Sequence, residues 1–445
     1  MHIPARVTDL KRSLRLVDGL AMVVGMTIGS GIFRTPGLVA AHLGRPGLTF
    51  VAWVLGGVVA LLGALCFAEL TTRLPRAGGR YVYVREAFGQ RAGFLAGWAE
   101  CLGTNAVAIA AIGVAGGEFL TRLLGAPPAR APAFGAGLVA AFTLINLVGV
   151  ASGRWVQNIV TAAKLLALGG VVVIAFLLGS GAGWHGALPG APRGLAVWPA
   201  LAVASQAVIW SYYGYADLAK IAGEVVEPSR TLPRVLLGAI AIVTTLYLLL
   251  NAAFVQVLPF DQIAASNLVA ADVAGVLVGA KGGIAVAVLA LLVVLASLNG
   301  NIFVTPRALF GLAGDGLAPT ALERVNSGGT PWIAMLLVAA FSIALAATGA
   351  FEPLLGLAIV LVLVVDGWAV IALFPLRRRG PAPFRVPLYP WVPAALLTVY
   401  GAVLAGTAIA QPALVARSAL VLAAAYALSW TVRAPAQEAA SRRSV

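Results

Sequence analysis

Charged residues are scarce in this chain. Only 10% of its 445 residues are Asp, Glu, Lys or Arg, whereas 61% are hydrophobic. A soluble globular domain carries roughly 25% charged residues. Together with a mean hydropathy of +0.97, this shortage excludes an ordinary soluble domain and predicts an all-α integral membrane protein. No stretch between the apolar runs is long enough for a separate soluble domain, so residues 1–445 are expected to form one transmembrane domain.

Cysteine and histidine are also rare. Cys66 and Cys101 both fall within apolar runs and are typical of small core residues, which argues against a disulfide or a metal pair. The histidines, His2, His42 and His185, lie near ends or loops, so a metal or catalytic cluster is not expected. A phosphate-binding loop of the G-x-x-x-x-G-K-[ST] type is missing, which argues against ATP drive. We therefore expect no cofactor, no metal site and no enzyme activity.

Long apolar runs dominate what is present. A membrane-spanning helix needs about 20 apolar residues. Twelve candidate spans meet this need, at 17–42, 47–72, 92–121, 133–150, 155–179, 199–222, 233–258, 282–308, 331–349, 352–376, 389–408 and 412–432. The runs are continuous rather than alternating, which excludes a porin-like barrel. The polar start and the length of the first run argue against a cleavable signal.

The formal charge of +14 is explained by topology. With the N-terminus inside, 22 of the 30 Lys and Arg residues fall on the cytoplasmic side, six fall outside, and Arg34 and Lys164 fall within spans. This positive-inside bias places both termini in the cytoplasm and the chain in the inner membrane. Nucleic acid is therefore not an expected partner, and the lipid bilayer is.

Two of the apolar helices are interrupted. The first span carries Gly29-Ser30-Gly31-Ile32-Phe33, and the sixth carries Tyr212-Tyr213-Gly214-Tyr215. Lipid offers no hydrogen bonds, so a broken helix is tolerated in a membrane only where its free backbone groups line a cavity. Breaks at spans 1 and 6 predict a five-plus-five inverted repeat, with repeat one at about 16–180 and repeat two at about 199–377. Two extra helices follow at about 387–433.

The first break suits a zwitterionic ligand. Gly29 and Gly31 let the backbone unwind and let a ligand approach closely. The half-helix that begins near Ile32 presents free N–H groups to a carboxylate, and the one that ends near Thr27 and Ile28 presents free carbonyls to an ammonium or a cation. An α-amino acid carries both charges. The alternative is close helix packing at small residues.

The second break is surrounded by bulky residues. Trp210 is a candidate aromatic gate on the outer side, with an ordinary packed or interfacial tryptophan as the alternative. Asp217 follows the break and either faces a water-filled vestibule or pairs with Lys220, three residues further along.

Ionisable residues inside spans are functional candidates, because charge is costly there. Lys164 lies about 15 Å into the fifth span, near the midplane. A buried ammonium can take the place of a bound cation, or it can release a proton. Ser297 in the eighth span is a candidate partner for Lys164, with helix packing as the alternative. Glu100, about 14 Å deep, is a candidate proton carrier or a partner of a cytoplasmic-side arginine, and Asp366 is a weaker candidate of the same kind.

The longest connection, 73–91, contains Gly78-Gly79 and a basic, aromatic run. We expect a short amphipathic or re-entrant element at the inner face, with a plain solvated loop as the alternative.

At these residues the chain resembles the amino acid–polyamine–organocation (APC) transporters. The resemblance is carried by "GMTIGSGIFRTPG" (25–37), "ELTTRLPRAGGRYVYVREAFG" (69–89), "GEVVEPSRTLPR" (223–234), "LNGNIFVTPRALFGLAGDGLAP" (298–319) and "FRVPLYPWVP" (384–393). It runs through essentially the whole chain. It implies twelve helices in the inverted-repeat, LeuT-like fold that is shared with sodium-coupled neurotransmitter transporters.

The resemblance also implies roles for residues. The amides of Ser30, Gly31 and Ile32 would bind the substrate carboxylate. The carbonyls of Thr27, Trp210 and Tyr213 would bind its amino group. Trp210 matches the gating aromatic of the L-type amino acid transporters, and Lys164 matches the lysine that stands in for the second sodium ion in sodium-independent members, with Ser297 beside it.

The chain also departs from family patterns. Tyr213 stands where the L-type pattern has small residues, which reshapes the side-chain pocket. Cationic amino acid members carry an acid where this chain has Ala216, and their acid in span 3 lies about one helical turn beyond Glu100. Both departures weaken the case for a cationic substrate.

The sequence therefore predicts a sodium-independent permease of small to medium neutral L-amino acids that works by alternating access, through proton symport or exchange. A cationic amino acid or polyamine carrier is the first alternative, and a non-transporting amino acid sensor is the second. No accessory subunit is evident. The predicted substrate site comprises Thr27, Ile28, Gly29, Ser30, Gly31, Ile32, Trp210, Tyr213, Gly214 and Tyr215. The predicted coupling residues are Lys164, Ser297 and Glu100.

Overall fold

The computed structural model describes residues 14–29, 31–76, 78–148 and 153–430, and every named element within them is helical. The first half contains α1 (Leu16–Thr27), α2 (Gly31–Leu43), α3 (Pro46–Arg73), α4 (Arg80–Phe88), α5 (Gln90–Trp98), η1 (Ala99–Ala106), α6 (Val107–Leu124), η2 (Pro128–Arg130), α7 (Ala131–Val148) and α8 (Gly153–Leu178). The second half contains η3 (Gly194–Ala196), α9 (Val197–Tyr212), η4 (Tyr215–Asp217), α10 (Leu218–Ile221), η5 (Ala222–Glu224), α11 (Pro228–Val257), α12 (Phe260–Ala265), α13 (Val269–Gly314), η6 (Thr320–Glu323), α14 (Trp332–Ala346), α15 (Phe351–Arg378), α16 (Trp391–Ala410) and α17 (Pro412–Ser429).

Many of the helices are long enough to cross a membrane. Within the described ranges, nine helices meet the length and hydropathy needed for a span, and the bent pair α1 and α2 makes a tenth. Each of the twelve predicted spans overlaps a helix. Two of these helices do not meet the criterion for a span: α14 has only 15 residues, and the apolar part of α17 ends at Ala427. The chain is thus an all-helical, multi-pass membrane protein, and the number twelve stays a prediction.

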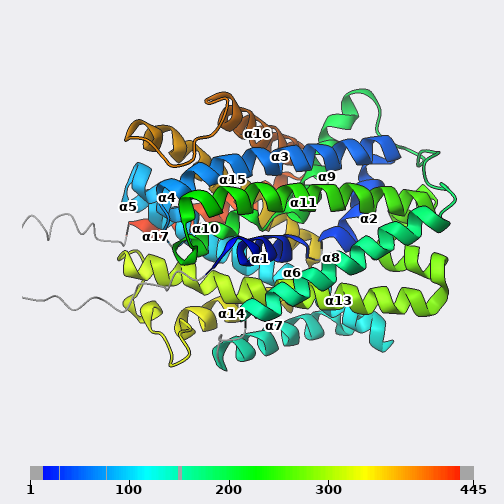
Figure 1. The fold of residues 1–445 in the computed structure, drawn as a ribbon, viewed down its shortest axis with the longest axis horizontal. Coiled ribbons are helices and arrows are strands. Elements are labelled where there is room, and N and C mark those ends of the chain that lie inside the picture. Colours follow the sequence, from blue (N-terminus) through cyan, green and yellow to red (C-terminus); the bar gives the residue numbers. More distant parts are fainter. Residues whose placement is uncertain (1–13, 30, 77, 149–152, 431–445) are drawn as a thin grey trace, which may run out of the picture.

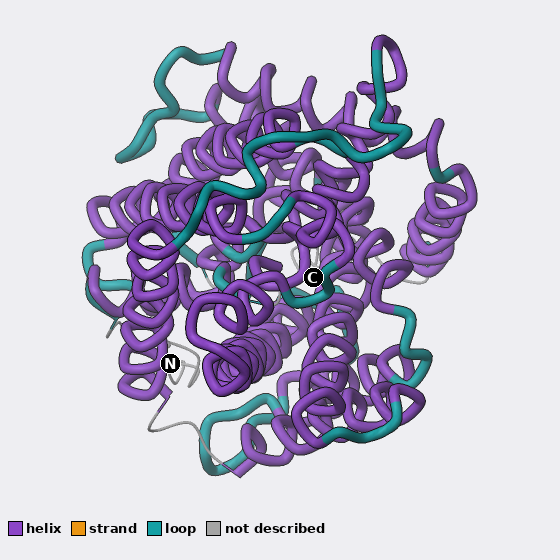
Figure 2. The backbone as a smooth tube through the Cα atoms, turned by 90° about the vertical axis from the view of Figure 1, so that its right-hand side faces the viewer, coloured by secondary structure: helices purple, strands orange, loops and turns teal. Residues whose placement is uncertain are grey.

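The helices form one bundle. Figure 1 shows them running lengthwise beside one another, with α1 in the interior, and Figure 2 looks along the bundle. The helix α1 packs against α8, α11 and α13, while α2 packs against α9 and α12. The two halves of the chain therefore meet at the first broken helix.

Burial separates the centre of the bundle from its rim. In the most apolar stretch of the spans at 90–124 and 353–378, which include α6 and α15, 72% of the residues are buried. The corresponding share is 28% for α7 and for α8. Along α8, the side chains of Ile159, Leu166, Val173 and Leu177 are exposed. Large apolar side chains on an exposed helix face are stable in lipid, so α7 and α8 face the bilayer and α6 and α15 form the centre.

The third predicted span is not a uniform α-helix. Residues Ala99–Ala106 (η1) are π-helical and join α5 to α6. Single π-helical turns inside α-helices are rare and occur frequently at functional sites. Glu100 lies in this segment and is fully buried.

The connection at 73–91 contains the short helix α4, whose first five residues, 80–84, are buried. Gly78 and Gly79 precede it with φ angles of +139° and +94°, which favour glycine. A Cβ atom on Gly79 would lie 2.8 Å from the Glu100 carboxylate. The turn therefore places the start of α4 against η1, while Phe88 and Arg91 at the far end of the segment are exposed. The segment is thus not a plain solvated loop, and its place at the inner face stays a prediction.

Candidate functional site

Both predicted helix breaks are present as interruptions of the backbone. The helix α1 ends at Thr27 and α2 begins at Gly31, with a bend of 42° between them. The helix α9 ends at Tyr212, Tyr213 is extended, and Gly214 has a φ of +136°. Ser30 lies outside the described residues.

Glycine lets the two breaks touch. A Cβ atom on Gly31 would lie 2.7 Å from Ser211 Cα, and one on Gly214 would lie 3.0 Å from the backbone nitrogen of Thr27. The hydroxyl of Tyr247 in α11 lies 3.0 Å from the Thr27 carbonyl oxygen and 2.9 Å from that of Ser211. Tyr247 thus bridges the two interrupted helices, a role that its sequence context did not signal.

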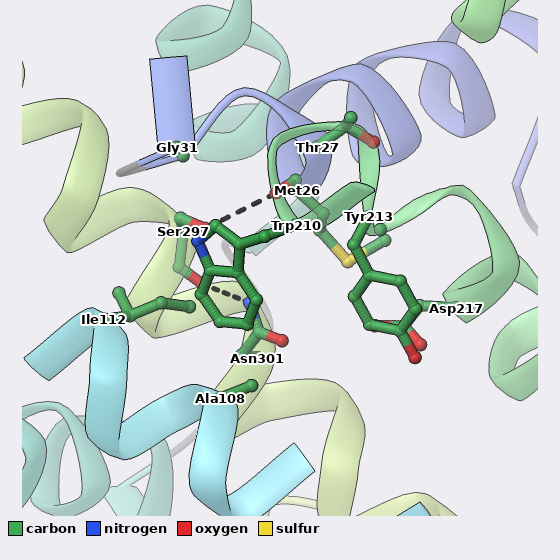
Figure 3. A pocket seen from close by; sticks show the side chains of 12 residues that line it. Met26, Thr27, Gly31, Ala108, Ile112, Trp210, Tyr213, Asp217, Ser297 and Asn301 are labelled. Carbon is green, nitrogen blue, oxygen red and sulfur yellow. Dashed lines mark hydrogen bonds between the residues drawn. The ribbon is translucent and has the colours of Figure 1, made fainter. Parts of the chain in front are cut away.

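A cavity lies where the breaks meet, and it encloses about 380 Å³ of empty space, part of it open to solvent. The lining residues are Met26, Thr27, Gly29, Gly31, Ala108, Ile112, Trp210, Tyr213, Gly214, Asp217, Ser297 and Asn301. Figure 3 shows the Trp210 indole in the middle of this pocket, with Tyr213 and Asp217 to one side. The walls come from α6 and α13 as well as from the breaks.

Most of the predicted binding residues border this cavity. Its lining includes six of them, Thr27, Gly29, Gly31, Trp210, Tyr213 and Gly214, together with Ser297 of the predicted coupling residues. Ile28, Ile32 and Tyr215 are buried beside the cavity instead, and Tyr215 packs edge-on against Phe67. The sequence did not single out Met26 of α1, nor Ala108 and Ile112 of α6. Identifying the wall residues of α6 requires the rotation of that helix.

Some of the free backbone groups already have partners. The Thr27 carbonyl accepts a 3.0 Å hydrogen bond from the Gly29 N–H and is also within reach of Tyr247. The Trp210 carbonyl accepts one from the Tyr213 N–H at 3.1 Å. An ammonium ligand at these two carbonyls would therefore have to share them.

Lys164 reaches the first break from α8. It is 1% exposed, and its Nζ donates hydrogen bonds to the carbonyls of Gly25 at 3.0 Å and Ile28 at 3.2 Å. The Ser297 hydroxyl donates instead to the Met26 carbonyl at 3.4 Å. Lys164 and Ser297 thus both donate to the last turn of α1 but to different carbonyl groups.

Beneath the second break lies a buried charged network, centred on Arg80. The Arg80 Nη1 atom lies 2.7 Å from Glu100 Oε1 and 3.3 Å from Asp217 Oδ1, and the guanidinium also contacts the carboxylate of Asp366 and the hydroxyl of Tyr213. Lys220 Nζ donates to Asp217 Oδ1 at 2.6 Å.

The network decides between the earlier alternatives. Glu100 pairs with an arginine, as one of them held, and its role as a proton carrier stays a prediction. Asp217 pairs with Lys220, as one of its alternatives held, and it also lines the pocket. A water-filled vestibule beside it stays a prediction. Asp366 joins the same cluster from α15. These five charges come from segments far apart in the chain and meet directly beside the cavity.

Sequence comparisons agree with this architecture. The amino acid permease family matches residues 14–429. The serine/threonine exchanger SteT of Bacillus subtilis is 30% identical over 86% of this chain and 88% of its own length. The mouse Asc-type amino acid transporter 1 is 30% identical over 91% and 78%, respectively. The mouse large neutral amino acids transporter small subunit 2 is 31% identical over 71% and 61%.

These proteins are named as transporters or exchangers, and their similarity covers between 71% and 91% of the chain. With two interrupted helices that face one cavity inside a helical membrane bundle, the chain belongs to the amino acid permease family of the APC superfamily.

Proposed function

We propose that this permease is a sodium-independent secondary transporter that moves small to medium neutral L-amino acids by alternating access, through exchange or proton symport. The observation that carries the proposal is the meeting of both breaks at one cavity beside Lys164. Unpaired backbone groups at helix ends can bind the carboxylate and the amino group that all α-amino acids share.

Sodium independence is supported by the position of Lys164. Its ammonium group is hydrogen-bonded to the carbonyls of Gly25 and Ile28, where a cation would otherwise be coordinated. An ammonium group at that place occupies the carbonyl oxygens that would otherwise coordinate a sodium ion.

A neutral substrate is supported by the pocket and by the relatives. The carboxylate of Asp217 is its acidic lining group, and this group is already paired with Lys220 and Arg80. The apolar part of the lining includes Met26 and Ile112. SteT is named as a serine/threonine exchanger, and another relative as a transporter of large neutral amino acids.

We further propose twelve spans in a five-plus-five inverted repeat of the LeuT-like fold, at about 16–180 and 199–377, with two extra helices at about 387–433. Both termini would lie in the cytoplasm and the protein in the inner membrane, as the distribution of Lys and Arg indicates. On this topology, α4 and the Arg80 network lie on the cytoplasmic side of the cavity.

The proposal includes no cofactor, no catalytic activity and no disulfide-linked accessory subunit. Cys66 and Cys101 are the chain's only cysteines, and both are buried within helices. Within the described ranges, no group of three His, Cys, Asp or Glu residues is arranged to hold a metal ion.

The test begins with thermal unfolding of the purified protein in the presence of each of the twenty L-amino acids and several polyamines. A ligand that binds the folded state raises the unfolding temperature. We expect stabilisation by neutral amino acids, sodium-independent uptake of the best ligand into proteoliposomes, and acceleration by internal amino acid or by a pH gradient.

The other outcomes separate the alternatives. Stabilisation by arginine or putrescine alone would favour the cationic or polyamine carrier. Binding without flux would favour a sensor. Uptake that requires sodium would contradict the role proposed for Lys164.

A further inference from the structure

We propose that Arg80 determines the charge selectivity of this permease: its guanidinium, held directly behind the cavity wall that Tyr213 and Asp217 form, excludes substrates with cationic side chains. This inference rests on the proposed function, because it concerns the same site.

Arg80 contacts the cavity through the residues that line it. It is 1% exposed and is hydrogen-bonded to the Tyr213 hydroxyl and to Asp217. Tyr213 and Asp217 both line the cavity, and Figure 3 shows them together on one side of it. The Arg80 guanidinium also lies over the Tyr213 ring, with Cζ 5.2 Å from the centroid. A single arginine therefore fixes the polar side of the pocket.

The charges around Arg80 form an acidic cluster that needs cations. Three carboxylates, those of Glu100, Asp217 and Asp366, face two cations, Arg80 and Lys220. With both cations present the cluster has a formal charge of −1, and without Arg80 the charge becomes −2. Without Arg80, the place beside Glu100 and Asp217 that its guanidinium fills would lack a cation. In a low-dielectric interior these carboxylates strongly favour another positive group in that place.

Arg80 currently supplies that positive group. A lysine or arginine substrate would have to bring its own charge next to the guanidinium. Juxtaposed like charges at a binding site cost several kcal/mol, which corresponds to far more than about tenfold in affinity. If Arg80 is removed, the side chain of such a substrate can take its place beside Asp217.

Lys220 does not provide the same barrier. Its Nζ lies 2.6 Å from Asp217 and 3.9 Å from Glu100. Lys220 thus contacts one residue of the cavity lining, Asp217, whereas the Arg80 guanidinium contacts two, Asp217 and Tyr213. Arg80 also enters from a different element: the Gly78-Gly79 turn and the hydrogen bond from its own N–H to Glu100, 3.1 Å long, hold the start of α4 in place. The position of this cation is therefore set by the backbone.

The experiment compares cationic with neutral ligands on matched variants. The central one is the double variant R80Q/D366N, which removes Arg80 together with the Asp366 carboxylate and so keeps the formal charge of the cluster at −1. R80K retains the positive charge. R80Q/D217N removes the carboxylate that lines the cavity. Each purified protein is tested by thermal unfolding, and by competition with the best neutral ligand, using L-arginine, L-lysine and L-alanine.

We expect L-arginine and L-lysine to bind R80Q/D366N about tenfold or more tightly than the wild type, and R80K and R80Q/D217N to gain nothing. A purely structural role for Arg80 would lower the stability of every variant without changing the ratio of cationic to neutral binding, and would overturn the proposal. An equal gain in R80K would also overturn it.

One measurement needs no variant. Wild-type protein that binds L-arginine as tightly as its best neutral amino acid would contradict exclusion by Arg80, even if no Arg80 variant folded. The proposed function fails separately, when the wild type binds no neutral amino acid.

Discussion

The two helix breaks face one cavity, yet their surroundings are built differently. At the first break, one lysine from α8 donates to two backbone carbonyls, those of Gly25 and Ile28. At the second break, five charged side chains from α4, η1, η4, α10 and α15 pair with one another. Of these five, Asp217 lines the cavity.

This difference in surroundings predicts which break tolerates substitution of its charged side chains. A buried charge that is bound to backbone dipoles can be replaced by a neutral group without leaving another charge unpaired. Removing one member of a buried ion-pair network leaves its partners uncompensated. The second break should therefore depend on its side chains for stability, and the first on its backbone geometry.

The largest effect is expected for Arg80→Met, which would leave three buried carboxylates facing Lys220 alone. Breaking a buried pair in this way costs about 3–5 kcal/mol of the free energy of unfolding. Thermal or denaturant unfolding in detergent measures it. Arg122→Met is the matched control, because the Arg122 and Asp272 side chains are 55% and 35% exposed, and it should cost less than about 1 kcal/mol. If Arg80→Met and Arg122→Met lost the same free energy of unfolding, the predicted difference between the buried network and a surface ion pair would be wrong.

The next effect is expected for Gly31→Ala, which tests the backbone contact between the breaks. The added Cβ would lie 2.7 Å from Ser211 Cα, and backbone atoms cannot move aside as a flexible side chain can. Overpacking of this kind costs about 1–3 kcal/mol, and we expect a loss of ligand binding of about tenfold or more. Gly170→Ala in α8 is the control, since no atom lies within 4 Å of its added Cβ. Unchanged binding by Gly31→Ala would contradict a ligand site at this backbone.

The smallest effect on stability is expected for Lys164→Met, which removes two hydrogen bonds but also a buried charge. A loss of about 1–2 kcal/mol follows from the unpaired carbonyls, while net transport should fall more than ligand binding from the outer side. Flux and binding assays on the same preparation separate the two. Ser297→Ala, which loses only a 3.4 Å hydrogen bond to Met26, should change little. Uptake and pH dependence that match the wild type would rule out a coupling role for Lys164.

Local signals in the sequence were enough for the first break. Gly29 and Gly31 in an apolar run predict an interruption, and counting residues from Arg154 places Lys164 at mid-depth without any knowledge of packing. The structure places Lys164 against the end of α1. These inferences depend only on the spacing of residues along one helix, which can be read directly from the sequence.

The second break shows where that approach ends. Arg80 lies in a run with Arg76, Arg85 and Arg91, so the positive-inside pattern explained it as one more cytoplasmic charge. Its ion pair with Asp366 joins residues 286 positions apart, which no local pattern reports. The π-helical turn at Glu100 likewise depends on backbone hydrogen bonding within a segment whose residue types suit an ordinary α-helix.

The contact between the breaks has a mechanical consequence. Because Gly31 and Gly214 lack side chains, their backbones lie directly against Ser211 and Thr27. The Tyr247 hydroxyl contacts the backbone of both interrupted helices. There is no clearance for one interrupted helix to slide along the other. We therefore expect a displacement of α1 to move α9 and η4 with it, so that the two interrupted helices move as one rigid unit, with the proposed ligand site where they join.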